Sequence, residues 1–242
     1  MLAKLYDNFR QDGNQAFDWH DYYLTQAQTL PDGPLKRFYE AGIPALDTKL
    51  ADAPMIALDL ETTGLRSQKD TIVSVGSVAM SAKRVKCASA KYWVVNPGAR
   101  LSAESITIHE LTHSDVEQAP PLSRYFDAIL EAMAGKVVVV HCAAIERQFL
   151  YQAAKKLYGQ DLFFPILDTL AIEQKVLKQR SLLKRIFTAN TSVRLDACRQ
   201  RYSLPRYKAH HALTDAFSSA ELLQAQIAHH FDADKPLTDY WS

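Results

Sequence analysis

Four consecutive valines, Val137–Val140, limit the folds open to this chain more than any other feature of its sequence. A strand without a polar face belongs in the middle of a sheet that other elements cover on both sides. The segments before and after it, 122–134 and 145–158, carry apolar residues at helical spacing, and each is followed by a glycine. A helix–strand–helix order of this kind predicts an α/β fold.

Four more strands complete the predicted sheet. They cover residues 55–60, 71–80, 91–96 and 163–167. Short links join the first three, which favours an antiparallel meander. Two helical blocks follow the last strand, at about 168–187 and 193–230, and the turn Leu204-Pro205 breaks the second one. The sequence therefore predicts a mixed five-stranded sheet flanked by helices.

The chain divides into three predicted segments. Residues 1–50 form a helical N-terminal extension, in which aromatic residues recur at roughly helical spacing and a Pro-Asp-Gly-Pro turn precedes a short helix at 35–41. The main domain covers 54–230, and a C-terminal tail covers 231–242. The extension either packs on the main domain or serves as an arm that docks a partner, and its residues do not separate these two interpretations.

The charge balance argues against a strongly basic nucleic-acid binder, because 28 Lys and Arg stand against 27 Asp and Glu. Nucleic acid is not excluded, since an acidic cluster that holds cations would cancel basic patches elsewhere. The three cysteines are far apart and lack zinc-ligand spacing. The first ten residues are not typical of a signal peptide, and no apolar stretch is long enough to cross a bilayer. We therefore expect a cytoplasmic protein that does not enter a membrane.

The strongest local signal is Asp59-Leu60-Glu61-Thr62-Thr63-Gly64-Leu65, at the end of the first strand. Residues two apart in an extended chain point to the same side, so the carboxylates of Asp59 and Glu61 converge. Two acids at the end of an apolar strand need a partner, and Mg²⁺ or Mn²⁺ prefers such oxygen ligands. The motif alone is also compatible with a strand end whose acids are solvated.

The second signal, His210-His211-Ala212-Leu213-Thr214-Asp215-Ala216, opens a helix whose apolar face is expected to pack on the sheet. His210 lies in the lead-in to that helix and Asp215 about a turn and a half later, which can bring both to one edge of a site. Imidazole titrates near neutrality, as a base that deprotonates water must. Taken alone, His210 could equally be a capping or surface histidine.

Together, the two motifs resemble those of the DEDDh exonucleases, the family of the proofreading epsilon subunit of bacterial DNA polymerase III, with oligoribonuclease and ribonuclease T as relatives. The resemblance covers roughly residues 54–230 and includes two further landmarks, 105–112 and 166–170. It implies a ribonuclease H-like fold. It also implies a metal-dependent 3′–5′ exonuclease that releases nucleoside 5′-monophosphates.

The middle motif departs from the family pattern. Where the family has His-Asn-x-x-Phe-Asp, this chain reads His141-Cys142-Ala143-Ala144-Ile145-Glu146. The expected acid is Glu146, one methylene longer, Cys142 replaces the asparagine, and His141 is expected to be structural. Glutamate keeps the charge and can reach a metal, so the resemblance implies a second metal site that fits less well or prefers manganese. The other interpretation makes Glu146 a helix-start acid favoured by the helix dipole, in a weakened enzyme.

The resemblance implies a role for each residue of the site. Two Mg²⁺ or Mn²⁺ ions, about 4 Å apart in sites of this kind, would be held by Asp59, Glu61, Glu146 and Asp215. His210 would be the general base that takes the proton from the attacking water. The terminal nucleotide would contact Thr62, Thr63, Gly64, Leu65 and His109, with Leu65 as a wedge against its base.

Several functions stay open at this point. The leading one is degradation of single-stranded DNA from the 3′ end in proofreading or repair, and RNA degradation of the oligoribonuclease or ribonuclease T type is the alternative. A third is a catalytically weakened module that only binds nucleic acid. The N-terminal extension could recruit a DNA polymerase. Basic residues form either a solvated helix face or a rim that contacts phosphates, at Lys175, Lys178, Arg180, Lys184 and Arg185.

Overall fold

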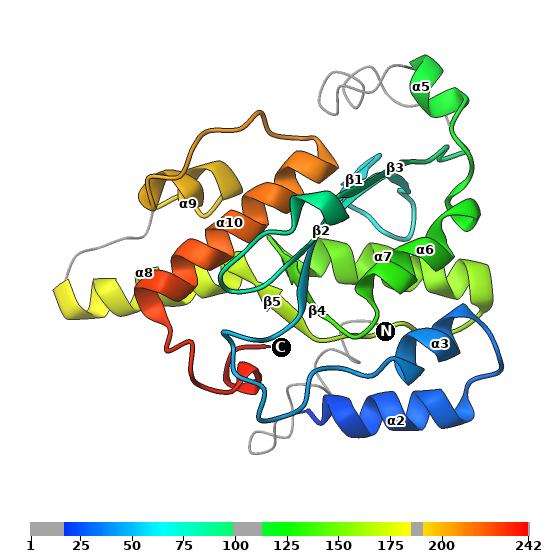
Figure 1. Cartoon of the computed structure of the whole chain (residues 1–242). Helices are drawn as coiled ribbons and strands as arrows, with labels where there is room; N and C mark the ends of the chain where they lie inside the picture. Colours follow the sequence, from blue (N-terminus) through cyan, green and yellow to red (C-terminus); the bar gives the residue numbers. More distant parts are fainter. Residues whose placement is uncertain (1–16, 99–112, 185–190, 242) are drawn as a thin grey trace.

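The predicted mixed sheet of five strands is confirmed by a computed structural model, which describes residues 17–98, 113–184 and 191–241. The spatial order is β3-β2-β1-β4-β5 (Figure 1). The strands are β1 Met55–Thr62, β2 Ile72–Met80, β3 Lys91–Val94, β4 Val137–Val140 and β5 Ile166–Asp168. Strands β1, β2 and β3 form the predicted antiparallel meander, and β4 pairs in parallel with β1 and β5.

The last strand begins later than predicted, at Ile166 rather than at residue 163. Pro165 explains the shift, because a proline has no N–H to donate to a neighbouring strand. Its carbonyl still accepts a hydrogen bond from Val138 N at 3.3 Å, and regular pairing starts at the next residue. Phe163 and Phe164 precede the strand and are buried in the core.

Helices cover both faces of the sheet. One face carries α2 Trp19–Thr29, α3 Pro34–Glu40, α6 Phe126–Met133 and α7 Ala143–Tyr158, and the other carries α8 Thr169–Lys184 and α10 Ala212–His230 (Figure 1). Alternation along β1 matches this division, since Ile56 and Leu58 pack toward the first group whereas Met55 and Ala57 pack toward α10. The remaining short elements are α5 His113–Glu117, α9 Leu195–Arg201 and the 3-10 turns Cys87–Ser89, Leu122–Arg124 and Leu237–Asp239.

Two predicted helices are interrupted in the structure. The segment predicted as a helix at 122–134 starts with a 3-10 turn, and α6 begins only at Phe126. The break in the last predicted helical block is longer than the predicted turn at Leu204-Pro205, because residues 202–211 separate α9 from α10. Within this connection Ser203 and His210 have positive φ angles of 56° and 70°, a left-handed backbone that a right-handed helix does not contain. The connection therefore forms a long loop that leads into α10.

The described part of the N-terminal extension packs on the main domain. Trp19 and Tyr39 are buried in the same core cluster as α6 and α7. The Tyr39 hydroxyl accepts a hydrogen bond from Phe163 N at 3.1 Å and donates one to Phe163 O at 3.2 Å. The C-terminal tail meets the end of the extension, where Leu50 N donates to Lys235 O at 2.9 Å. These contacts favour the packing interpretation, while the predicted segment boundaries stay predictions.

In the described parts of the chain, no helix is both long enough and apolar enough to cross a membrane.

Candidate active site

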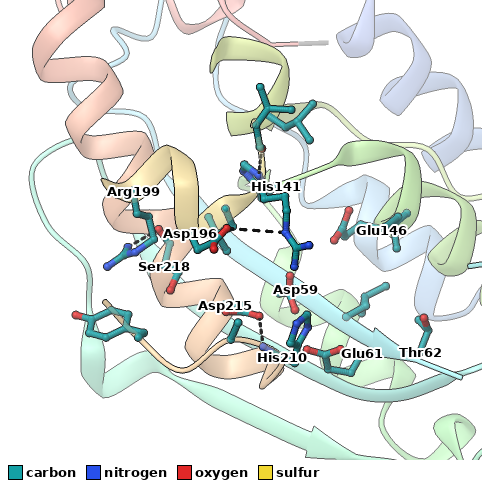
Figure 2. Close-up of a pocket in the computed structure, with 18 of the residues that line it drawn as sticks. Asp59, Glu61, Thr62, His141, Glu146, Asp196, Arg199, His210, Asp215 and Ser218 are labelled. Carbon is teal, nitrogen blue, oxygen red and sulfur yellow. Dashed lines mark hydrogen bonds and ion pairs between the residues drawn. The ribbon is translucent and has the colours of Figure 1, made fainter. Parts of the chain in front are cut away.

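Strand β1 carries Asp59 and Glu61 near its carboxyl end. Both lie on the α10 side of the sheet, because they continue the alternation that starts with Met55 and Ala57 (Figure 2). The strand runs to Thr62, further than predicted, and its pairing with β2 shifts between Glu61 and Thr62. The two carboxylates therefore reach the same side of the sheet at its carboxyl-terminal edge.

A glycine that the sequence analysis did not single out brings α10 close to this strand. Gly76 of β2 pairs with Asp59 of β1. A Cβ atom at Gly76 would lie 2.2 Å from both the Ala212 carbonyl carbon and the Leu213 nitrogen, so only glycine leaves room for the first turn of α10. An isolated glycine within an apolar strand was the available signal, because it marks a close approach of another backbone.

The start of α10 supplies a histidine and a third carboxylate. His211 caps the helix, where its side chain accepts a backbone N–H and its ring stacks on Tyr92 at a centroid distance of 4.5 Å. His210 precedes the cap, and its N–H donates to Asp215 Oδ2 at 2.8 Å. Side-chain ligand atoms of Glu61, His210 and Asp215 lie within 4.8 Å of one another. The structure thus brings together predicted site residues from both ends of the domain.

Helix α7 supplies the fourth carboxylate, Glu146, in its first turn. Cys142, with a φ of 99°, turns the chain from β4 into this helix. The Asp168 carboxylate holds that turn, because its oxygens accept from Cys142 N and Ala143 N, each at 3.0 Å. It also accepts from Leu170 N at 2.9 Å, so one side chain caps both α7 and α8. Oε2 of Glu146 is buried and has no hydrogen-bond partner among the described residues.

Burial and mutual repulsion raise the pKa values of these acids. Burial raises the pKa of Asp59 well above its ordinary value, and the charges of Glu146, Glu61 and Asp215 raise it further. Burial likewise raises the pKa of Glu146 well above its ordinary value; a hydrogen bond from its own backbone N–H opposes this, and the charges of Asp168 and Glu61 raise the pKa further. For Asp215, burial raises the pKa and the hydrogen bond from His210 N–H opposes it. Ionised carboxylates in this arrangement are costly without a compensating positive charge.

The donor set fits a divalent cation. The cluster combines hard carboxylate oxygens with one buried oxygen, Glu146 Oε2, to which no described residue donates a hydrogen bond. Such oxygen-rich sites suit Mg²⁺ or Mn²⁺, and the charge of the ion would offset the repulsion among the acids. Asp59, Glu61, Glu146 and Asp215 are therefore the residues that could hold metal.

A cavity of about 1130 Å³ opens beside these acids. One wall is the turn after β1, where all of the predicted substrate contacts at 62–65 line the cavity and Leu65 is 77% exposed. Thr63 N donates to Thr71 O at 2.9 Å, and the Thr62 hydroxyl donates to Gly64 O at 2.7 Å, so the turn has a defined shape. The other predicted contact, His109, lies outside the described residues, as does the landmark 105–112.

The positive charges beside the cavity come from α9 and its flanking segments. The lining includes Arg194, Arg199 and Arg206. The basic residues that the sequence offered as a possible rim belong instead to α8, except for Arg185, which follows it in the sequence. Lys175 and Lys178 are exposed on α8 and are not part of this lining, whereas the side chains of Arg180, Lys184 and Arg185 lie outside the described part of the chain. For the described lysines, the structure favours a solvated helix face.

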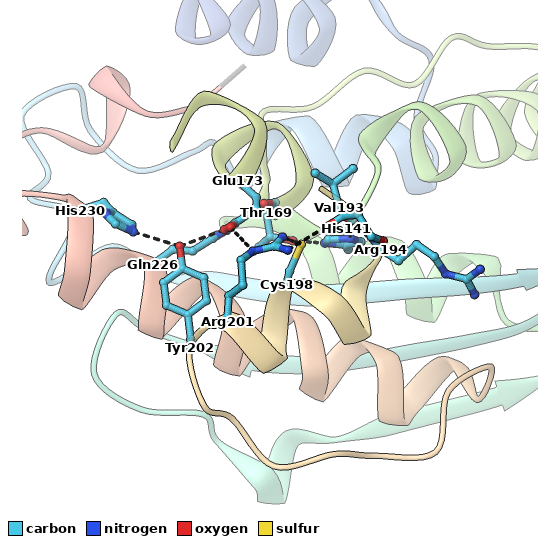
Figure 3. Close-up of polar contacts among 11 residues, drawn as sticks. His141, Thr169, Glu173, Val193, Arg194, Cys198, Arg201, Tyr202, Gln226 and His230 are labelled. Carbon is cyan, nitrogen blue, oxygen red and sulfur yellow. Dashed lines mark hydrogen bonds and ion pairs between the residues drawn. The ribbon is translucent and has the colours of Figure 1, made fainter. Parts of the chain in front are cut away.

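A polar network holds α9 in place (Figure 3). The carboxylate of Glu173, fully buried on α8, pairs with Arg201 Nε of α9 at 2.8 Å. On the other side of the network, a ring nitrogen of His141 lies 2.9 Å from Val193 O. This contact fits the structural role predicted for His141, and it anchors the backbone that leads to Arg194.

Comparison with known proteins agrees with this geometry. A family model described as exonuclease matches residues 56–223. The PolC-type DNA polymerase III of Thermotoga maritima is 28% identical over 176 residues, which cover 73% of this chain. The chain spans only 12% of the length of that relative.

Solved structures show the same fold. Cell-death related nuclease 4 superimposes with a TM-score of 0.63 at 14% identity, covering 73% of this chain and 64% of that one. Exonuclease X in complex with 5′ overhanging duplex DNA gives a TM-score of 0.55 at 18% identity, covering 75% of this chain and 96% of that one. At these identities the likeness concerns the fold alone, and it confirms the predicted ribonuclease H-like architecture.

Proposed function

Because the chain belongs to the exonuclease family, we propose that it is a metal-dependent enzyme that removes nucleotides from the 3′ ends of single-stranded DNA and releases nucleoside 5′-monophosphates. The observation that carries the proposal is the convergence of carboxylates and a histidine beside one cavity (Figure 2). These residues are Asp59, Glu61, Glu146, His210 and Asp215. Buried acids that repel one another weaken a fold, so their presence favours a catalytic role.

The four carboxylates would hold two divalent cations, Mg²⁺ or Mn²⁺. The charges of Glu146, Glu61 and Asp215 all raise the pKa of Asp59, which supports a role in which Asp59 would help to hold both ions. Glu146 would contribute to the second ion its Oε2, which has no hydrogen-bond partner in the described part of the chain. When bound, such cations supply positive charge that polarises a phosphate and makes a water molecule more acidic.

His210 is the proposed general base. Its side chain is exposed and lines the cavity, while its backbone N–H is fixed to Asp215 Oδ2 at 2.8 Å. A ring nitrogen of His210 would accept the proton of the attacking water and pass it on to solvent. On the other side of the acids, the turn at 62–65 would hold the terminal nucleotide, with the exposed Leu65 against its base.

DNA is the proposed substrate because the relative from Thermotoga maritima is a DNA polymerase and exonuclease X is known in complex with DNA. The same polymerase relative supports a cytoplasmic role beside a DNA polymerase. The outward face of the packed N-terminal extension would be its contact surface, and Leu24 on α2, 62% exposed, belongs to that face. RNA is the alternative substrate, because the same acids would serve both polymers.

The test is a degradation time course with 5′-labelled single-stranded DNA and RNA of one sequence, in Mg²⁺, Mn²⁺ or EDTA. We expect metal-dependent shortening from the 3′ end, faster on DNA, and none with Asp59→Ala. Asp52→Ala is the matched control, because Asp52 is an exposed acid just before β1, at the end of the strand away from the cavity. It should keep full activity.

Three other outcomes would change the proposal. Faster shortening of RNA would select the RNA alternative. Full activity in Asp59→Ala would refute the assignment of the site. An inactive wild-type chain, with activity appearing in Glu146→Asp, would show that the longer acid has switched the enzyme off and that nucleic-acid binding is the remaining function.

A further inference from the structure

The connection between α9 and α10 places an aromatic ring on the cavity wall. Tyr207 lines the cavity and is 44% exposed, so its ring is not used to fill the core. Its ring packs against Arg199, and Figure 2 shows Arg199 and Thr62 on opposite sides of the acids. A strand that runs to the acids would therefore have Tyr207 on one side and the turn carrying Leu65 on the other.

The Tyr207 ring is held in one orientation by its neighbours. The Arg199 guanidinium lies 4.6 Å from the ring centroid, and the Tyr207 hydroxyl donates to Glu221 Oε1 at 3.0 Å. The other oxygen of Glu221 accepts from Arg199 at 2.7 Å. Arg199 is only 4% exposed and also donates to Ser218 O at 2.8 Å and Pro205 O at 2.9 Å. The position of the ring is thus fixed from two directions before any ligand binds.

A fixed aromatic ring on such a wall suits a nucleobase. Every base has a flat face, so stacking on an aromatic side chain binds single strands without selecting their sequence. A ring already held in place loses little conformational entropy when a base stacks on it. Arg194 and Arg206 line the same cavity and could contact the phosphates beside a stacked base. Arg194 is available for this, because its pairing with Asp196 is 4.0 Å long and both side chains are about 75% exposed.

We propose that Tyr207 is a stacking platform for the base of the second nucleotide from the 3′ end. This inference rests on the proposed function, which places the terminal nucleotide against the turn at 62–65. The base on the opposite side of the acids then belongs to the next nucleotide along the strand. Arg199 and Glu221 are positioning residues, because they act on the substrate only through the ring.

The experiment compares two substrates that differ in the presence of this second nucleotide. The methyl ester of thymidine 5′-monophosphate has a single base and no other aromatic ring, whereas a short oligothymidylate offers the second base. Tyr207→Leu should raise KM for the oligonucleotide roughly 5- to 150-fold, the range expected for one stacked base. It should leave hydrolysis of the ester near the wild-type rate. Tyr207→Phe keeps the ring and should keep most of the oligonucleotide affinity.

A modified substrate tests the same contact from the other side. An oligonucleotide that lacks only the second base should lose affinity for the wild-type chain, and Tyr207→Leu should cause no further loss with that substrate. Equal losses on the ester and the oligonucleotide would overturn the proposal and make Tyr207 a support for the loop that carries His210. If the wild-type chain hydrolyses neither substrate, the proposed function fails, and binding of fluorescent oligothymidylate still decides about Tyr207. Equal binding by wild type and Tyr207→Leu would then refute the platform.

Discussion

Gly76→Ala adds a methyl group where the first turn of α10 crosses strand β2. The new Cβ would lie 2.2 Å from the Ala212 carbonyl carbon and the Leu213 nitrogen, whereas ordinary contacts of this kind begin at 3.4 Å. The obstructing atoms are backbone, so no side-chain rotation relieves the clash. The strand and the helix must therefore separate by about 1.2 Å.

The displacement has two consequences of different size. Overpacking of this kind costs about 1–3 kcal/mol of the free energy of unfolding. For a chain of this length, that corresponds to a fall in Tm of roughly 2–4 °C per kcal/mol. The same shift moves Asp215 and His210 away from Asp59, and a misplacement of about 1 Å lowers a rate on the order of 10²-fold. We therefore expect a folded protein that has lost most of its kcat.

The assay combines kcat on single-stranded DNA with thermal unfolding followed by circular dichroism. Gly33→Ala is the matched control, because a Cβ at Gly33 meets nothing closer than 3.8 Å, and it should change neither quantity. Wild-type kcat and Tm in Gly76→Ala would show that the close approach of α10 is not required for the site. A fall in Tm with unchanged kcat would show that the position of α10 matters for stability alone.

Three further predictions follow from the site. Burial and the charge of Glu146 raise the pKa of Asp59, so its ionisation weakens the metal-free fold as pH rises above about 4, the value in an unfolded chain. In EDTA at neutral pH, Asp59→Asn should therefore have a higher Tm than wild type, and a lower one would contradict the shift. His210→Ala should lose about 10²–10⁴-fold in kcat, whereas a change in KM alone would exclude the general-base role. Arg194→Gln should reduce the dependence of DNA binding on log salt by roughly one unit, measured by fluorescence anisotropy, and Arg84→Gln, on the turn after β2, should not.

The sequence was most informative where the local spacing of apolar and polar residues decides which side of the sheet a side chain faces. Alternation along β1 predicted that Asp59 and Glu61 share a side of the sheet, because a period of two holds for any extended chain. The apolar run of β4 predicted its central place, since neither face of such a strand tolerates water. The position of Glu146 came from the family resemblance and not from a period, so its role is still a prediction.

Features that depend on which elements become neighbours were not predictable from the sequence. The pairing of Arg199 with Tyr207 and Glu221 requires α9, the connection 202–211 and α10 to meet. Asp168 was expected only as a family landmark, and its capping of both α7 and α8 emerges from the parallel order of β4 and β5. The position of the break between α9 and α10 was predicted correctly, but its length was not. Tertiary contacts decide which residues, such as His210, adopt a left-handed backbone conformation.

The close approach of α10 at Gly76 also bears on the order in which the site forms. Asp59 and Asp215 are 156 positions apart in the chain, yet this contact makes them neighbours. Contacts between distant segments form late in folding, because the entropy of closing a long loop is lost before the contact can stabilise the chain. Synthesis proceeds at about 5–20 residues per second, so all five strands leave the ribosome well before α10 does. A nascent chain can therefore assemble its sheet while the metal-binding acids are still apart, and hydrolytic activity arises only when the last long helix docks.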